Sequence, residues 1–359
     1  MLYLTFAAGL VLLIVGADVL VRGASKLALS WGISPLVVGL TVVAFGTSAP
    51  EFAVSLRGAL EGQADISLGN VVGSNILNIL LILGISALIV PLIVNRQIVR
   101  QEVPIMVGAS VLLFVLSLDG EIGRIEGGLM FFGLFAYIGL LYRQSRRRPA
   151  DELDLELPPE SNWDRHWAVQ LLLVVVGLGL LLLGARWLVQ AAIVFAQWLG
   201  VSELVIGLTV VAVGTSLPEI ATSIIAALRG QRDMAVGNIV GSNIFNILGV
   251  AGLTALVAPM ALPVSQALIT FDMQVMLAAA IACLPILFSG HLIARWEGAM
   301  FFGYYCAYTA FLILASAEHD ALDEFATVMQ WVVLPITAAT LLAISVRELR
   351  RRRQGLRPG

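Results

Sequence analysis

Residues 39–51 read GLTVVAFGTSAPE and residues 207–219 read GLTVVAVGTSLPE, so one segment occurs twice with 11 of 13 positions identical. Both copies keep a Pro-Glu pair, at Glu51 and Glu219, inside a largely apolar stretch. Proline lacks a backbone N–H, and the neighbouring glycine and hydroxyl residues further loosen a helix. We therefore predict a broken helix at each copy, with Thr47 and Glu51 one turn apart on the same face.

The composition around these segments predicts a membrane protein. Of the 359 residues, 59% are hydrophobic and 13% are charged, with a mean hydropathy of +0.94, which is too apolar for a water-soluble fold. A helix needs about 18 or more apolar residues to cross a bilayer. We predict an all-α integral membrane protein with about eleven such helices, near 2–22, 33–57, 66–91, 103–119, 125–142, 167–188, 203–228, 234–258, 272–289, 296–316 and 326–346.

The basic residues predict the orientation of these helices. Lys and Arg are retained on the cytoplasmic side, and they concentrate in the connector 143–166 and in the tail ELRRRRQGLRPG at 348–359. Six predicted spans separate the two segments, so both can be cytoplasmic. The N-terminus is then outside and the C-terminus cytoplasmic, in a multi-pass protein of the cell (plasma or inner) membrane.

The repeat extends beyond the opening segment. GNVVGSNILNIL at 69–80 returns 168 residues later as GNIVGSNIFNIL at 237–248, with 10 of 12 positions identical. We predict a first five-helix repeat at 1–142, a cytoplasmic linker at 143–166, a second repeat at 167–316, and an extra C-terminal helix with a basic tail at 317–359. An odd number of crossings inverts the second repeat, which is an architecture typical of secondary transporters. Asp18 and Arg186 are equivalent in the repeat, and inversion predicts that they do not pair.

The polar residues of the two motifs predict a site at the interface of the repeats. Ionisable groups at mid-membrane depth mark functional sites, whereas a single Pro-Glu pair could be only a kink whose glutamate caps a half-helix. We interpret Asn70 and Asn238 as helix-packing residues. Every available donor is an oxygen, which suits hard cations such as Ca²⁺ or Na⁺. A proton remains the alternative charge carrier. The candidate residues from the second motif are Ser74, Asn78, Ser242 and Asn246.

GTSAPE with GNVVGSN, repeated as GTSLPE with GNIVGSN, resembles the paired alpha-repeats of the sodium/calcium exchanger family. The resemblance implies that Glu51 and Glu219 coordinate Ca²⁺ and take part in Na⁺ binding, with Asn78 and Asn246 lining the centre. Some potassium-dependent relatives carry aspartate at the position of Asn246, which argues against potassium cotransport here. The resemblance further implies hydroxyl or carbonyl oxygen ligands from Thr47, Ser48, Ser74, Thr215, Ser216 and Ser242, and backbone oxygens from Ala44 and Ala212.

These observations predict a secondary antiporter that exchanges Na⁺ for Ca²⁺ by alternating access. The resemblance implies three Na⁺ per Ca²⁺, and hence one net charge per cycle. We expect ions and the lipid bilayer as partners, no cofactor, no nucleic acid and no obligate protein partner. A Ca²⁺/H⁺ antiporter is the nearest alternative, and a cation channel is another. An intramembrane acid–base enzyme is disfavoured because no nucleophile, metal-binding His or phosphate loop accompanies the glutamates. The eleventh helix could serve packing or dimerisation.

Overall fold

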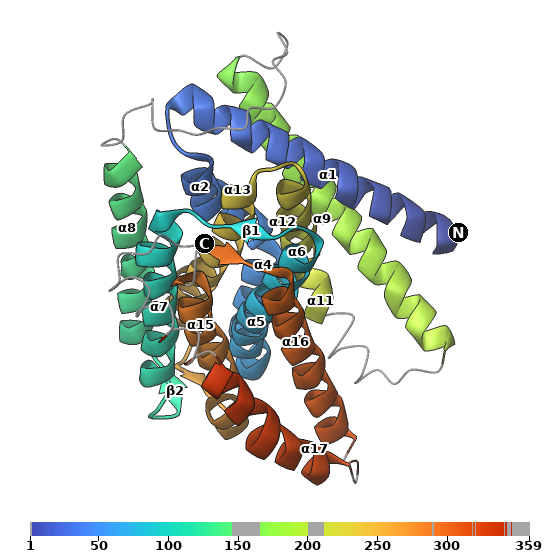
Figure 1. Cartoon of the computed structure of the whole chain (residues 1–359), viewed down its shortest axis with the longest axis vertical. Helices are drawn as coiled ribbons and strands as arrows, with labels where there is room; N and C mark the ends of the chain where they lie inside the picture. The colour runs from blue at the N-terminus through green and yellow to red at the C-terminus, as the bar shows by residue number, and fades with distance from the viewer. Residues whose placement is uncertain are drawn as a thin grey trace.

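The computed structural model describes residues 2–145, 166–199, 212–288, 291–317, 319, 321–340, 342 and 346. The predicted linker 143–166, the start of the predicted span 203–228 and the basic tail lie largely or wholly outside these residues. Within them the chain is built almost entirely from helices (Figure 1). Several helices contain a wider π-helical turn, and these segments carry the prefix η.

The first half contains α1 (Leu2–Trp31), α2 (Pro35–Val38), η1 (Gly39–Val43), α3 (Ala44–Thr47), α4 (Ala49–Leu60), α5 (Ala64–Leu77), η2 (Asn78–Leu83), α6 (Gly84–Ile89), β1 (Leu92–Ile93), η3 (Ile98–Glu102), α7 (Val103–Leu116), β2 (Glu121–Ile122) and α8 (Arg124–Ser145). The second half contains α9 (Trp167–Trp198), α11 (Ala212–Thr215), α12 (Leu217–Leu228), α13 (Arg232–Ile244), η7 (Phe245–Ala251), α14 (Gly252–Val257), β3 (Leu262–Pro263), η8 (Leu268–Asp272), α15 (Met273–Phe288), β4 (Leu292–Ile293) and α16 (Arg295–Ser316). After it come α17 (Leu322–Val328) and η9 (Met329–Val333).

The all-α membrane fold is confirmed. Eight helices in the described part of the chain are long and apolar enough to cross a bilayer, and a bent pair, Pro35–Thr47 with Ala49–Leu60, raises the number to nine. The predicted count of eleven is not confirmed, because the spans predicted at 203–228 and 326–346 both extend outside the described residues.

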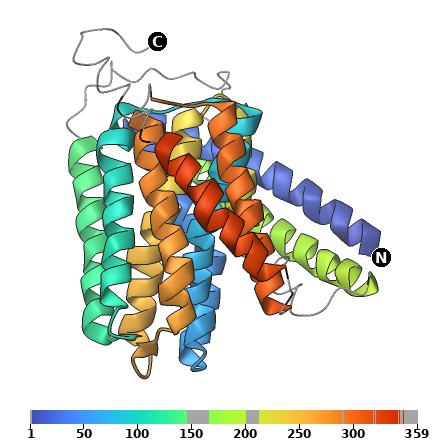
Figure 2. The same ribbon diagram turned by 60° about the horizontal axis from the view of Figure 1, so that its bottom comes forward.

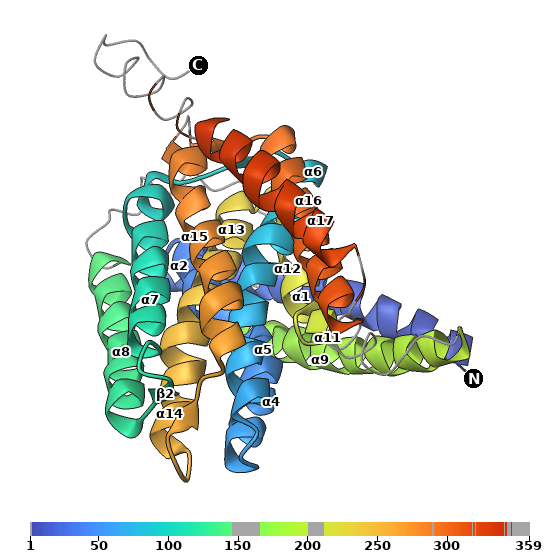
Figure 3. The ribbon, with the colours of Figure 1, turned by 90° about the horizontal axis from the view of Figure 1, so that it is seen from below.

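Helices α1 and α9 form a closely packed pair that leans across the outside of the other helices (Figures 1 and 3). Glycines allow this approach. A Cβ atom added at Gly16 would lie 2.7 Å from the backbone nitrogen of Leu181, and one added at Gly184 would lie 2.6 Å from that of Leu13. Small residues that let backbones approach are the usual basis of helix pairing in membranes. The two long helices are therefore joined along a tight contact lined by glycines.

The rest of the molecule repeats the same contacts in both halves. Two short antiparallel strand pairs, β1 with β4 and β2 with β3, each join one half to the other. Gly84 of α6 meets α16 at Gly298, and Gly252 of α14 meets α8 at Gly127. These crossings hold the outer helices against the centre and leave the two halves interlocked.

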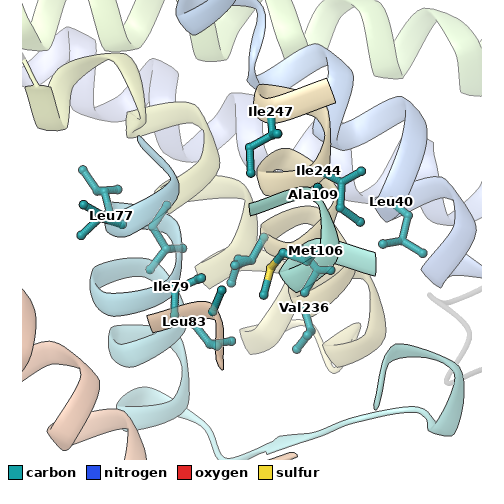
Figure 4. Close-up of a cluster of buried hydrophobic side chains, with 14 of the residues drawn as sticks. Leu40, Leu77, Ile79, Leu83, Met106, Ala109, Val236, Ile244 and Ile247 are labelled. Atoms are coloured by element: carbon teal, nitrogen blue, oxygen red, sulfur yellow. The ribbon is translucent and has the colours of Figure 1, made fainter. Parts of the chain in front are cut away.

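An apolar shell surrounds the centre of the molecule. Figure 4 shows buried side chains from η1, α5, η2, α7, α13 and η7 converging there. Met106, Ile79 and Ile247 are each at most 1% exposed. Any polar group inside this shell is therefore separated from lipid and from bulk water, and needs a partner within the protein or a bound ion.

The described part of the C-terminal segment packs on the second half. α17 crosses α16 and lies over its outer face (Figure 2), and the hydroxyls of Tyr304 and Thr337 are hydrogen-bonded across this contact. A mainly apolar cavity of about 540 Å³ lies between α15, α16 and this segment. The segment thus packs against its own chain, which is one of the two roles that the sequence left open for it.

Candidate functional site

The two repeated motifs form broken helices, as the sequence predicts. α3 ends at Thr47, α4 begins at Ala49, and the two parts of the span differ in direction by 48°. Ser48 at the break has φ −81° and ψ 9°, and Ser216 in the second half has nearly the same angles, −91° and 8°. Pro50 and Pro218 lie in the first turns of α4 and α12, where a missing N–H costs nothing. Each glutamate therefore sits in the first turn of a half-helix, at the positive end of its dipole.

Glu51 and Glu219 are buried at the centre and are bound by the opposite half. The Ser216 hydroxyl donates to Glu51 Oε1 at 2.8 Å, and the Ser48 hydroxyl donates to Glu219 Oε1 at 2.9 Å. Both carboxylates are only 1% exposed. The two hydrogen bonds are related by the internal repeat, so the motifs of the two halves form a single site.

Several oxygens in this site have no hydrogen-bonding partner among the residues that the structure describes. They are Glu51 Oε2, Glu219 Oε2, Asn78 Oδ1, Ser242 Oγ and Asn246 Oδ1. A buried polar oxygen without a partner loses its hydration and gains nothing in return. All five come from residues that the sequence singled out, and all five are acceptors that could bind a cation.

Asn70 and Asn238 form hydrogen bonds to the helices that carry the two glutamates. Asn70 Nδ2 donates to the Glu51 carbonyl at 3.0 Å and to Ser55 Oγ at 2.9 Å. Asn238 Nδ2 donates equivalently to Ser223 Oγ at 3.0 Å, while Asn238 Oδ1 accepts from the Thr47 hydroxyl at 3.2 Å. The interpretation of these two asparagines as packing residues agrees with these bonds.

The serines that accept these bonds, Ser55 and Ser223, were not predicted from the sequence, although they too recur at the offset of 168. A second pair of asparagines was not predicted either. Asn243 Oδ1 accepts from Asn78 Nδ2 at 3.1 Å, and Asn243 Nδ2 lies 3.3 Å from the sulfur of Met106. Asn75 Nδ2 is likewise 3.7 Å from the sulfur of Met276. Asn75 and Asn243 stand inside the quoted motifs, so their recurrence was the available signal.

The remaining predicted residues lie around the same centre. Ser74 is 4% exposed, Thr47 is fully buried, and Thr215 is half-buried at the end of α11. The Ala44 carbonyl already accepts the Ser48 N–H at 3.0 Å and the Thr47 hydroxyl at 3.4 Å. Ala212 is the first residue of α11.

The donor set defines what the site can bind. No group of three or more His, Cys, Asp or Glu residues occurs in the part of the chain that the structure describes. Two carboxylates surrounded by neutral hydroxyl and amide oxygens suit Ca²⁺ or Na⁺ rather than a soft transition metal. Neither carboxylate is ion-paired among the described residues, so a bound cation would supply the missing counter-charge.

Two halves of a multi-pass helical protein that meet at a buried polar centre with broken helices define the class of secondary transporters. Within this class, the chain belongs to the sodium/calcium exchanger protein family. The model of that family matches residues 1–143 and 169–314.

The chain is similar to several individual members. It is 42% identical over 281 residues to the putative antiporter CaxA of Alkalimonas amylolytica, covering 77% of this chain and 86% of that protein. It is 33% identical over 344 residues to the sodium/calcium exchanger MaX1 of Methanosarcina acetivorans, covering 86% and 98%. The inner membrane protein YrbG of Escherichia coli (strain K12) is 43% identical over 256 residues, covering 70% and 78%.

A solved structure of the sodium-calcium exchanger NCX_Mj, soaked with zero Na⁺ and Ca²⁺, has the same fold. It matches with a TM-score of 0.74 at 32% identity and covers 86% of this chain and 97% of that chain.

Proposed function

We propose that this protein is an antiporter that exchanges Na⁺ for Ca²⁺ across the membrane by alternating access. The observation that carries the proposal is the pair of buried carboxylates, each bound by a serine of the opposite half and each with one oxygen unpaired. Two negative charges balance one Ca²⁺. Relatives whose names include sodium and calcium, MaX1 and NCX_Mj, support this choice of ions.

The proposed ligands of the ions are the residues of the two motifs. Glu51 and Glu219 would coordinate Ca²⁺ and share Na⁺, while the unpaired oxygens of Asn78, Ser242 and Asn246 would complete the centre. Hydroxyl or carbonyl oxygens would come from Thr47, Ser48, Ser74, Thr215 and Ser216. The Ala44 carbonyl can join an outer Na⁺ site once the Thr47 hydroxyl turns from it to the ion, because a carbonyl has two lone pairs. By the repeat, Ala212 would contribute in the same way.

The buried carboxylates also explain why transport should be exchange and not uniport. An empty site would carry two uncompensated charges through a low-dielectric interior, which is energetically costly. Either Ca²⁺ or Na⁺ removes that cost, so the protein changes access readily only when it is loaded. We place the N-terminus outside and the C-terminus in the cytoplasm, with the repeats at 1–142 and 167–316 on either side of the 143–166 linker and the additional segment at 317–359.

The experiment is Ca²⁺ uptake by proteoliposomes loaded with Na⁺ and diluted into Na⁺-free buffer at clamped pH. Uptake that requires the Na⁺ gradient supports the proposal. Uptake that ignores Na⁺ but follows an imposed proton gradient would replace it with Ca²⁺/H⁺ antiport, since the names CaxA and YrbG specify no counter-ion. Ca²⁺ flux without any counter-ion gradient would indicate a channel.

A further inference from the structure

An ion pair outside the candidate site connects the α1–α9 pair to the centre of the molecule. Asp18 of α1 is paired with Arg229, the residue that caps the C-terminal end of α12. Both side chains are partly accessible, at 39% for Asp18 and 63% for Arg229. Neither residue is hydrogen-bonded to the buried carboxylates among the described residues, so the pair lies outside the candidate site.

The internal repeat gives this pair a counterpart with the charges reversed. Moving 168 residues along the chain takes Asp18 to Arg186 of α9, and moving back by the same offset takes Arg229 to Glu61. Glu61 caps the C-terminal end of α4 as Arg229 caps α12. Each long helix therefore has a possible acid–base partner at the C-terminal end of the broken helix in the other half. Asp18 of α1 has Arg229 after α12, and Arg186 of α9 has Glu61 after α4.

Only one of the two pairs is formed in this structure. Among the described residues, Arg186 is exposed and has no ion pair. Glu61 is instead bound within its own helix by Arg57, at 2.7 Å on the exposed surface. As the sequence predicts, Asp18 and Arg186 do not pair with each other.

The packing of the helices has the same asymmetry. α1 packs along α12, whereas α9 makes no comparably extensive contact with α4 in the described part of the chain. α1 and α9 pack antiparallel, with Gly16 facing Leu181 and Gly184 facing Leu13. Residues 14–15 and 182–183, which are equivalent in the repeat, therefore face each other. Asp18 and Arg186 lie about one helical turn beyond this point, in opposite directions. The half-helices start together at the buried glutamates, and inversion of the second repeat predicts that their C-terminal ends lie toward opposite faces of the membrane.

We propose that Asp18–Arg229 and Arg186–Glu61 are reciprocal latches, by which we mean that each ion pair forms in, and stabilises, only one of the two access states of the transporter. In inverted-repeat transporters, access alternates when one repeat or bundle rocks against the other around the fixed site. Because α1 and α9 are joined by their glycines, a tilt that separates Asp18 from Arg229 brings Arg186 to Glu61 and releases Arg57. This inference rests on alternating access in the proposed function, but not on the identity of the ions.

The latches bias the equilibrium between the states and do not lock it. Partly exposed ion pairs change an equilibrium by about fivefold or less, and a transporter must visit both states in every cycle. Loss of one latch should therefore shift the populations by about two- to fivefold toward the other state.

Cysteine cross-linking tests the proposal directly in lipid nanodiscs, on a background in which Cys283 and Cys306 are replaced by alanine. Asp18→Cys with Arg229→Cys reports the state described here, and Glu61→Cys with Arg186→Cys reports the second state. We expect an oxidant to join both pairs, and dithiothreitol to reverse both bonds.

A matched control uses Glu61→Cys with Trp198→Cys. Trp198 is exposed on the same helix, 12 residues beyond Arg186 and hence about 18 Å farther along its axis. We expect no disulfide in this control. A cross-link at 61–198 as strong as that at 61–186 would indicate general flexibility and would overturn the proposal.

A variant with all four latch cysteines tests whether the latches exclude each other. After oxidation, a maleimide–polyethylene glycol gel shift counts the free thiols left in each molecule. Reciprocal latches leave at least two free thiols in every molecule. Molecules with none would carry both bonds at once and would overturn the proposal, as would a 61–186 pair that never forms while 18–229 does.

Charge reversal supplies a second measurement that needs no disulfide. Glu61→Arg should slow exchange by about two- to fivefold, and Arg186→Glu in the same chain should restore it. If Glu61 acts only through Arg57, Arg186→Glu will give no rescue. Cross-linking needs no ion gradient, so exclusive latches in a protein without Na⁺-driven uptake would refute the choice of ions and leave the latches standing.

Discussion

Replacing Glu51 with glutamine is the sharpest test of the candidate site. Glu51 Oε1 accepts a hydrogen bond from the Ser216 hydroxyl at 2.8 Å, and Oε2 has no partner in the described part of the chain. Glutamine has nearly the same shape and keeps an acceptor for Ser216, so Glu51→Gln should fold normally. It removes one of the two negative charges that would face a bound Ca²⁺.

The size of the effect follows from burial. Glu51 is 1% exposed, and truncating one partner of a buried charge pair costs about 2–5 kcal/mol. At about 1.4 kcal/mol per factor of ten, the Kd for Ca²⁺ should rise roughly 30-fold to several thousand-fold. Without ions the variant should be at least as stable as the parent chain, because a repulsion between buried carboxylates is removed.

The assay is calorimetric titration with Ca²⁺, together with the ion-induced shift in Tm. A ligand at 100 times its Kd stabilises a protein by about 2.7 kcal/mol, and most of that stabilisation should vanish in Glu51→Gln at the same Ca²⁺ concentration. Glu102→Gln is the matched control: Glu102 is fully buried but accepts from Gln97 and Tyr137, away from the motifs. A parental Kd in Glu51→Gln, or an equal loss in both variants, would refute the assignment.

Three further perturbations follow from other contacts. Ser216→Ala removes a hydrogen bond to a charged group and should weaken Ca²⁺ binding by about 1.5–3 kcal/mol in titration, whereas Ser110→Ala, which loses only a bond to its own helix, should bind normally. Asn246→Asp adds a third carboxylate at a side chain with no partner; Ca²⁺ affinity should rise, and because a proton competes for the new group, the gain should disappear as pH falls across a titration series. Gly16→Ala would place a Cβ 2.7 Å from the backbone of α9 and should destabilise the protein by about 1–3 kcal/mol in thermal unfolding, while Gly179→Ala meets no atom within 4 Å and should not.

The helix breaks and the two glutamates could be predicted from local sequence. Proline with neighbouring glycine and hydroxyl residues weakens a helix, and the second copy of the motif made a mere kink implausible. The pairing of Ser48 with Glu219 could not be predicted in the same way, because the partners are 171 residues apart and meet only when the halves dock. Asn243 could not be predicted for the same reason, because its side-chain amide contacts Asn78 and Met106, which lie on other helices.

The amino-acid sequence alone predicts a helical membrane protein that consists of two inverted copies of one unit and whose polar motifs supply only oxygen ligands. Those properties follow from composition, from the repeat offset and from residue type, which need no coordinates. Which oxygens already have hydrogen-bonding partners, and which are left for a cation, becomes visible only when the helices are packed together. The packing also decides which of the two acid–base pairs is formed. The repeat makes the pairs equivalent in sequence, but α1 packs against α12 while α9 has no comparable contact with α4 in the described part of the chain.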